Sequence, residues 1–386
     1  MSSISVPRVS ARGWFLAALL LLSLFSLPAA ADEVDAPDGT EVWLVTYGPG
    51  EVYWQRFGHN AIWVRDERLG LDHTFKFGFF DFGQENFFLR FLMGRMLYFS
   101  AAQKAGEEFA QYVAENRGIR AQRLNIASDR KAELVRFLLN EVRPENRDYL
   151  YDYYRNNCST RVRDALDQAL DGAIRRENES LPARLNWRGH TRRLTQEDFW
   201  LYLGLETVLG PLVDRPVSRW DEMFIPGVLA DALADQARWV LEERQVYEST
   251  LPSLAESPKA VWPRYLLAAL VVLLLAALLS RWLPAVLLAR SWLFIGGLAG
   301  SAMLFFWFGT DHAVAAFNLN LLLFNPLWLV LALSKNAARF ALQTVAVFGV
   351  LAVAVALSPG QYSADAVAAF LPINLLAAYV LNRISV

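Results

Sequence analysis

The chain has 386 residues, a formal net charge of −2, and a composition that is 54% hydrophobic and 20% charged. This composition excludes a disordered or collagen-like chain, and the near-zero net charge provides no basic field for nucleic acid. Almost all of the 39 acidic residues lie within residues 32–262, whereas residues 263–386 are nearly free of charge. The sequence therefore predicts a soluble domain over 32–262 and a membrane domain over 263–386, and it excludes a wholly cytosolic soluble protein.

The first 31 residues have the pattern of a secretory signal peptide. Arg8 and Arg12 precede an apolar run over residues 13–27, and the small residues Ala29 and Ala31 stand at the expected cleavage positions. An uncleaved membrane anchor is the alternative. Either interpretation places residues 32–262 outside the cytoplasm.

The soluble part is predicted to combine short strands with helices. Strand composition and intervening turn residues predict strands at Glu41–Tyr47, Ala61–Arg65, His73–Phe77 and Arg120–Ile126. Ser128 is predicted to cap a helix over Asp129–Arg143. A further helix is predicted to begin within residues 156–161 and to continue through residue 170.

Cys158 is the chain's one cysteine, so it has no partner for an internal disulfide bond. An inert buried thiol is one interpretation, and a nucleophile is the other. Asn157 is a good N-cap, which makes Cys158 the first residue of the predicted helix. Helix-start amides and the positive end of the helix dipole stabilise a thiolate, so we expect a pKa lowered from about 8.5 into the range of about 3.5–7.5.

A nucleophilic thiol needs a base, and His59 is the first candidate. It follows Gly58 and opens the predicted strand Ala61–Arg65, which holds the imidazole rigidly; a hydrogen-bonded turn histidine is the alternative role. His73 is the reserve candidate, and His190, among arginines, is predicted to be solvent exposed. A histidine on a strand together with a cysteine at a helix start is the layout of papain-like thiol enzymes.

Residues 263–386 contain five apolar segments of membrane-spanning length: Tyr265–Ser280, Ser291–Thr310, Ala313–Ser334, Phe340–Leu357 and Ala366–Asn382. If the soluble domain lies outside, the inner connections and the C-terminal end carry five Lys and Arg residues, and the outer connections 310–312 and 358–365 carry none. The positive-inside rule favours this topology.

Polar residues of the third segment gather at its outer end, on the same side of the membrane as Cys158. They are His312, Asn318 and Asn320, and we predict that they bind substrate. Asn325 and Asn374 lie deeper and are predicted to bond between helices or to line a cavity.

The motifs around these residues resemble a known family. The sequences FGHNAIWV (57–64), FKFGFFDF (75–82), DYYRNNCSTRVRDAL (152–166) and TDHAVAAFNLNLLLFNPL (310–327) are similar to those of the Lnb-type bacterial lipoprotein N-acyltransferase family. The resemblance implies an α+β permuted papain-like (NlpC-like) periplasmic domain followed by an all-α bundle of about five transmembrane helices. It also implies a multi-pass protein of the bacterial inner (cell) membrane.

The family resemblance implies that the chain N-acylates bacterial lipoproteins through a Cys158 acyl-thioester, with His59 as base. Asn157 and the helix-start amides are expected to stabilise the oxyanion, Asp81 to orient His59, and Arg161 to bind a headgroup phosphate. The expected partners are membrane phospholipid or diacylglyceryl lipoprotein, with no nucleic acid, no cofactor and no metal. The alternatives are an extracytoplasmic thiol hydrolase (a lipid esterase or cell-wall amidase) and a non-catalytic membrane assembly protein.

Overall fold

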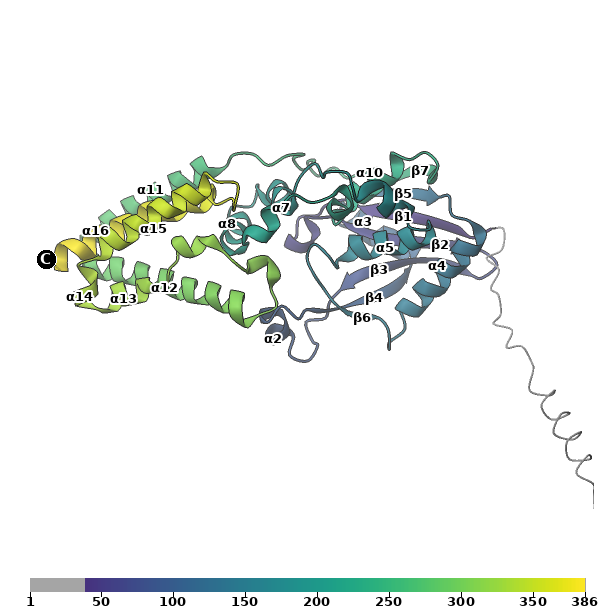
Figure 1. Cartoon of the computed structure of the whole chain (residues 1–386). Helices are drawn as coiled ribbons and strands as arrows, with labels where there is room; N and C mark the ends of the chain where they lie inside the picture. Colours follow the sequence, from purple (N-terminus) through teal and green to yellow (C-terminus); the bar gives the residue numbers. More distant parts are fainter. Residues whose placement is uncertain (1–38, 386) are drawn as a thin grey trace, which may run out of the picture.

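A computed structural model describes residues 39–385, so the predicted signal peptide over residues 1–31 lies outside the described residues. The described chain has two parts (Figure 1). A sheet with helices forms the N-terminal domain, residues 39–261, and a helical bundle follows from Trp262 onward. The bundle extends away from one end of the N-terminal domain, and the chain ends at its far tip (Figure 1).

The N-terminal domain is organised around one antiparallel sheet of seven strands in the order β6-β4-β3-β2-β1-β5-β7. Four of them, β1, β2, β3 and β5, correspond to the predicted strands. The sequence pattern does not predict β4, β6 and β7. Their residues lack the regular alternation of apolar and polar side chains that is typical of a half-buried strand. The strand bounds are β1 Glu41–Tyr47, β2 His59–Asp66, β3 Leu71–Phe79, β4 Leu97–Lys104, β5 Ile119–Leu124, β6 Asp148–Leu150 and β7 Val240–Tyr247.

Some helices of the N-terminal domain cover the sheet, and others lie between the sheet and the bundle (Figure 1). They are η1 Tyr53–Gln55, α2 Phe87–Leu92, α3 Ala105–Ala114, α4 Ser128–Glu141, α5 Cys158–Ala169, α6 Ala173–Asn178, α7 Trp187–Thr195, α8 Phe199–Val208, η2 Pro211–Asp214, α9 Arg219–Glu222 and α10 Pro226–Ala234. Helix α5 packs on β2 and β3 through Val162 and Leu166, which are fully buried with Ile62 and Phe75. Ser128 is the first residue of α4 rather than its cap.

The bundle contains three helices that are long and apolar enough to span a membrane, α11, α12 and α16, among the residues that the structure describes. The predicted third span is broken: residues 313–322 and α13 form a pair bent by 44°, which makes a fourth span if counted as one. Helix α15, with 16 residues, is shorter, so the count of five spans stays a prediction. The bounds are α11 Trp262–Leu279, α12 Ala285–Gly309, η3 Ala313–Ala315, η4 Leu319–Leu322, α13 Leu327–Leu333, α14 Lys335–Ala338, α15 Ala341–Ala356 and α16 Ala364–Ser385.

The broken segment packs against a face of small residues on α12. A Cβ atom on Gly300 would lie 2.1 Å from the carbonyl oxygen of Phe324, and one on Gly297 would lie 2.7 Å from the backbone nitrogen of Leu329. Backbone therefore meets backbone here, an approach that small residues permit between membrane helices.

A buried polar cluster joins the two domains. At the start of α16, Asp365 accepts a hydrogen bond from the Tyr202 hydroxyl (2.8 Å) and lies 3.4 Å from Arg192. Arg188 donates to Asp214 (2.8 Å), and its guanidinium lies 3.6 Å from Glu206. Because these groups are buried, removing one partner of a pair would leave an uncompensated charge, which is unfavourable. The paired groups therefore hold the bundle to the N-terminal domain.

The close approach at Gly300 predicts a stability effect. Gly300→Ala places a methyl group against Phe324 and should lower the thermal unfolding midpoint of the detergent-solubilised chain by several degrees, because backbone on both sides resists movement. Gly204→Ala in α8 is the matched control. Its Cβ meets no atom within 4 Å, and Ala favours a helix over Gly by about 1 kcal/mol. Equal midpoints for the two variants would contradict the packing described.

Candidate functional site

Cys158 is the first residue of α5, as the sequence predicts, and its side chain is half-buried. The Asn157 Oδ1 atom accepts a hydrogen bond from the Thr160 N–H (2.9 Å), and the Thr160 hydroxyl accepts one from the Asn157 N–H (2.8 Å). This capping box fixes the helix start, because it satisfies two otherwise unpaired donors.

The remaining polar atoms of the Asn157 side chain are also used. Its Nδ2 atom donates to the carbonyl oxygens of Tyr153 and Phe224, both at 3.0 Å. Since neither amide hydrogen is left over, the contacts place Asn157 as a helix cap rather than as the predicted oxyanion donor. The backbone N–H groups that favour a Cys158 thiolate are instead those of Asn60, Ser159 and Cys158 itself.

His59 lies beside Cys158, although 99 residues separate them along the chain. It begins β2, pairs with Tyr47 of β1, and stacks its imidazole on the Tyr47 ring at 6.4 Å. The His59 Cε1 atom and the Cys158 Cβ atom both lie within 4 Å of the position that a Cβ atom of Gly78 would occupy. The imidazole and the cysteine side chain predicted from the sequence therefore both border Gly78.

Gly78 is the residue that permits this approach, and sequence reasoning missed its role. It lies at an irregularity of β3, has φ of +99°, and a Cβ atom there would lie 3.4 Å from the Cβ of Cys158. A glycine inside a strand pattern signals a bulge or a close backbone approach, so FKFGFF contained the clue.

Asn60 is a second residue that sequence reasoning missed. Its buried side chain accepts from the Thr46 hydroxyl (2.9 Å) and donates to Ser159 Oγ (3.1 Å). The Ser159 hydroxyl in turn donates to the Met223 carbonyl (2.6 Å). These bonds tie β1 and β2 to the start of α5. An amide in an otherwise apolar strand was the available signal.

Burial sets the protonation states of the pair. It raises the pKa of the Cys158 thiol to about 11, and the three backbone donors lower it only in part. Burial, together with the positive charges of Lys76 and Arg117, lowers the pKa of His59 to about 3. The expectation of a thiol pKa below about 8.5 is therefore wrong, and the resting site holds a neutral thiol beside a neutral imidazole.

The other predicted first-domain residues lie elsewhere. Asp81 is exposed and accepts a hydrogen bond from the Gly83 N–H (2.7 Å), and no contact among the described residues links it to His59. Arg161 was predicted to bind a headgroup phosphate. Its guanidinium instead forms an ion pair with Glu141 (2.6 Å).

The two remaining histidines of this domain are separate from the thiol. His73 pairs across the sheet with Val64, at the end of β2 opposite to His59. His190 is fully buried and bonded to Glu222 (2.6 Å), so the prediction of solvent exposure is wrong. Neighbouring arginines did not indicate exposure, because a carboxylate from another helix reaches the imidazole.

His312 is separated from the thiol by aromatic side chains. Its Nε2 atom bonds to the Phe91 carbonyl oxygen (2.8 Å), and its ring stacks on Tyr153 at 6.5 Å. Tyr153 contacts Tyr151 edge-on at 5.9 Å, and the Cys158 charge contributes to raising the pKa of Tyr151. The predicted neighbourhood of His312 and Cys158 is therefore indirect, through two tyrosines.

Asn318 and Asn320 cap helix α8. The Asn318 amide donates to the carbonyl oxygens of Thr207 and Val208 (2.9 and 3.0 Å), and the Asn320 amide donates to those of Glu206 and Thr207 (2.9 and 3.0 Å). Helix-end carbonyls lack partners in their own helix, so these bonds satisfy them. Both side chains are buried, and their donors are committed to joining the domains rather than left for the substrate contact predicted.

Asn374 bonds between helices, one of the two roles predicted for it: it accepts from the Trp292 indole (2.8 Å) and donates to the Leu323 carbonyl (2.9 Å). Asn325 donates to the Leu321 carbonyl within its own segment (3.2 Å).

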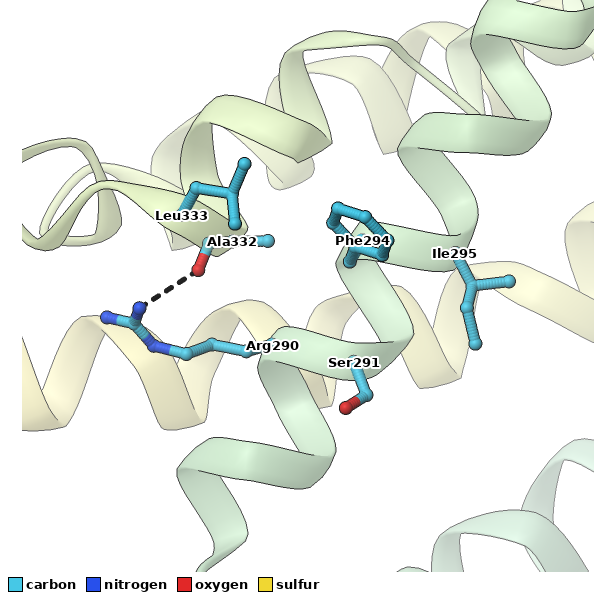
Figure 2. A pocket seen from close by; sticks show the side chains of 6 residues that line it. All are labelled: Arg290, Ser291, Phe294, Ile295, Ala332 and Leu333. Atoms are coloured by element: carbon cyan, nitrogen blue, oxygen red, sulfur yellow. Dashed lines mark hydrogen bonds between the residues drawn. The ribbon is translucent and has the colours of Figure 1, made fainter.

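Two surface pockets lie away from the thiol. Figure 2 shows one of about 380 Å³ between α12 and α13, lined by Arg290, Ser291, Phe294, Ile295, Ala332 and Leu333. The Arg290 guanidinium donates a hydrogen bond to the Ala332 carbonyl oxygen (3.0 Å), so it bonds within the bundle. Within residues 39–385, no three His, Cys, Asp or Glu side chains gather as a metal site.

The raised thiol pKa predicts how alkylation of Cys158 depends on pH. The thiolate reacts with iodoacetamide and appears only as pH approaches about 11, so the rate should rise about tenfold per pH unit between about pH 7 and 10. A cysteine peptide with a pKa of about 8.5 is the control and should level off earlier. Stopped assays with mass spectrometry report a single site, because the chain has one cysteine. A rate that is constant from pH 7 to 9 would contradict the neutral pair.

Comparison with protein families accounts for both parts of the chain. The Lnb N-terminal periplasmic domain matches residues 27–195, and the Lnb transmembrane domain matches residues 256–385. No curated protein and no solved structure matches the chain. The first match contains His59 and Cys158, and the second contains the helical bundle. The chain therefore belongs to the Lnb family and is a membrane protein with a periplasmic domain.

Proposed function

We propose that this protein is a cysteine-dependent acyltransferase that N-acylates bacterial lipoproteins. The observation that carries the proposal is the meeting of His59 and Cys158 at Gly78, beneath three backbone N–H groups. A thiol, a base and oxyanion donors are the parts that acyl transfer through a thioester requires. Membership of the Lnb family and the attached transmembrane domain support a substrate held in the membrane.

In the first step, the Cys158 sulfur attacks an ester carbonyl of a phospholipid or a diacylglyceryl group. His59, which is neutral at rest, takes the thiol proton as the carbon–sulfur bond forms. The backbone N–H groups of Asn60 and Ser159 stabilise the oxyanion, each such donor being worth about 2.7–4 kcal/mol in known enzymes. The ester carbon–oxygen bond then breaks, and the leaving oxygen takes the proton back from His59. An acyl-thioester on Cys158 remains.

In the second step, the α-amine of the lipoprotein's lipid-bearing N-terminal cysteine attacks this thioester. His59 accepts the proton of the attacking amine and returns it to the leaving sulfur, so the amide forms and the thiol is restored. With a pKa of about 3, His59 is unprotonated at neutral pH, which is the form that accepts a proton in both steps.

The fold supports a permuted papain-like interpretation of the periplasmic domain. The thiol is at the start of α5, the histidine is on the adjacent strand β2, and the chain order is histidine before cysteine. In the topology that we propose, the bundle crosses the bacterial inner membrane five times, with the broken segment 313–333 as the third crossing and the N-terminal domain on the periplasmic side.

The shape around Gly78 predicts a selective loss of activity. Gly78→Ala introduces a side chain at φ of +99° and 3.4 Å from the Cys158 Cβ, so acylation should fall at least tenfold. Gly70→Ala is the matched control, because Gly70 also has a positive φ, +60°, but its Cβ would meet no atom within 4 Å. Both substitutions place an L side chain at a positive φ, but only the one at residue 78 brings it against Cys158. Equal activities in a lipoprotein acylation assay would contradict the role given to Gly78.

The proposed chemistry predicts the state of lipoprotein N-termini in cells. In a host without its own lipoprotein N-acylation, the wild-type chain should yield N-acylated lipoproteins by mass spectrometry. Cys158→Ala and His59→Ala should lose this product by about 10²-fold or more at unchanged membrane level. His73→Ala is the matched histidine control and should keep activity, because His73 lies at the opposite end of the sheet.

Free-amine N-termini in the presence of the wild-type protein would overturn the proposed function. Release of free fatty acid without an N-acyl product would identify a hydrolase instead. Full acylation by Cys158→Ala would remove the thioester from the mechanism.

A further inference from the structure

The N-terminal domain exposes a group of large apolar side chains, which we call the apolar rim. The six-residue helix α2, with the sequence FFLRFL, has none of its residues buried, and Phe88 is 78% exposed. Exposed apolar clusters of this kind mark interaction sites on proteins. The rim consists of Val52, Tyr53, Trp54, Phe82, Phe88, Leu89, Phe91 and Leu92.

Aromatic contacts hold the rim together across two segments of the chain. Phe80 contacts Trp54 at 6.1 Å and Phe82 at 5.0 Å, and Phe82 contacts Phe87 of α2 at 5.0 Å. The rim therefore joins the segment before β2, which leads to His59, with the segment after β3, which follows Gly78. The rim therefore borders the site along both β2 and β3, the strands that carry His59 and Gly78.

The rim is fastened to the end of a membrane helix. The backbone N–H of Asp311, just after α12, donates to the Met93 carbonyl (2.8 Å), and Asp311 also pairs with Arg95 (2.7 Å). A Cβ atom on Gly94 would lie 2.8 Å from the Asp311 carbonyl carbon, so the two backbones are in direct contact. Figure 1 shows α2 beside this end of α12. The rim therefore lies beside the end of α12, which is long and apolar enough to span a membrane.

The apolar surface continues from the rim onto the bundle. His312 contacts Phe91 of α2 at 6.4 Å and Phe306 of α12 at 5.7 Å, which bridges the two elements. Phe308 and Phe317 are exposed beside this junction. If lipid surrounds α12, an apolar surface that continues from this helix onto α2 is expected to contact lipid as well.

We propose that the apolar rim inserts into the outer leaflet of the cytoplasmic membrane, with α2 lying in the interface. Interfacial helices place aromatic and leucine side chains about 5–10 Å into the boundary between headgroups and acyl chains. Arg90 lies within α2 and makes no ion pair among residues 39–385, so its cation faces no internal competitor for lipid phosphate. The insertion depth is that of glycerolipid ester groups, which brings them to the level of the site.

A spin-label experiment on the full chain tests this insertion. Cys158→Ser removes the chain's one cysteine, and Phe88→Cys then introduces a single site for a nitroxide. The labelled protein is reconstituted in phospholipid vesicles of phosphatidylethanolamine and phosphatidylglycerol. Collision of the label with oxygen, which concentrates in the bilayer, is compared with collision with a water-soluble nickel chelate. Leu241→Cys on β7 is the matched control, because Leu241 is an apolar residue that is 54% exposed.

The label at residue 88 should collide at least several-fold more with oxygen than with the chelate, and the label at 241 should show the reverse. Chelate access at 88 equal to that at 241 would overturn the proposal. Protection at 88 from both reagents, with spin–spin broadening that disappears on dilution with unlabelled protein, would assign the rim to a second copy and overturn it as well. Because both variants lack the thiol, the outcome is independent of acyl transfer, and the proposed function stands or falls separately.

Discussion

The hydrogen bonds that lock the start of α5 against β2 are the constraint on which the site depends. Asn157 and Thr160 cap the helix reciprocally, and Asn60 reaches from β2 to Ser159, the residue after the thiol. Each bond is buried, so losing one partner leaves an unsatisfied polar group at a cost of about 1–3 kcal/mol. The cap fixes where Cys158 stands, and the Asn60 bond fixes its distance from the strand that carries His59.

A second constraint couples this site to the membrane domain. The third apolar segment does not continue as a regular helix, and the backbone that it leaves unpaired is satisfied outside the segment. The Val314 carbonyl accepts from the Gly210 N–H (2.8 Å), and the Leu319 N–H donates to the Gln361 side chain (2.8 Å). The Asn318 and Asn320 side chains in turn bond to the carbonyls at the end of α8. Irregular backbone near a membrane is tolerated where protein covers it. The break in the segment is thus the device that fastens the two domains together.

Burial favours the neutral form of acidic side chains at both polar centres of the protein, but the charges that oppose it differ. At the thiol it keeps both partners neutral, because the positive charge of Arg117 lowers the thiol pKa only in part, while Lys76 and Arg117 disfavour a protonated His59. At the domain junction it raises the pKa of Glu206 to about 7, against the opposing effect of Arg188 and Arg192. The first centre holds a neutral thiol and a neutral imidazole at rest, and the second joins the two domains through buried ion pairs.

Much of this protein was determined by local patterns in the sequence. The strands at 41–47 and 59–66, the Asn157 cap, Cys158 as the first residue of α5, and the apolar character of the bundle all follow from residue type and spacing. His59 was predicted as the base because a glycine and an apolar strand flank it, and the structure places it near Cys158. These features depend on neighbours in the chain, which a sequence displays directly.

Long-range packing decided the rest. The raised thiol pKa, the use of Asn318 and Asn320 as caps, and the burial of His190 against Glu222 all depend on partners distant in sequence. The bulge at Gly78 acquires its meaning only when α5 is placed over it. Residue type states which bonds a side chain is able to make, but competition among distant groups for the same buried space determines which bonds form.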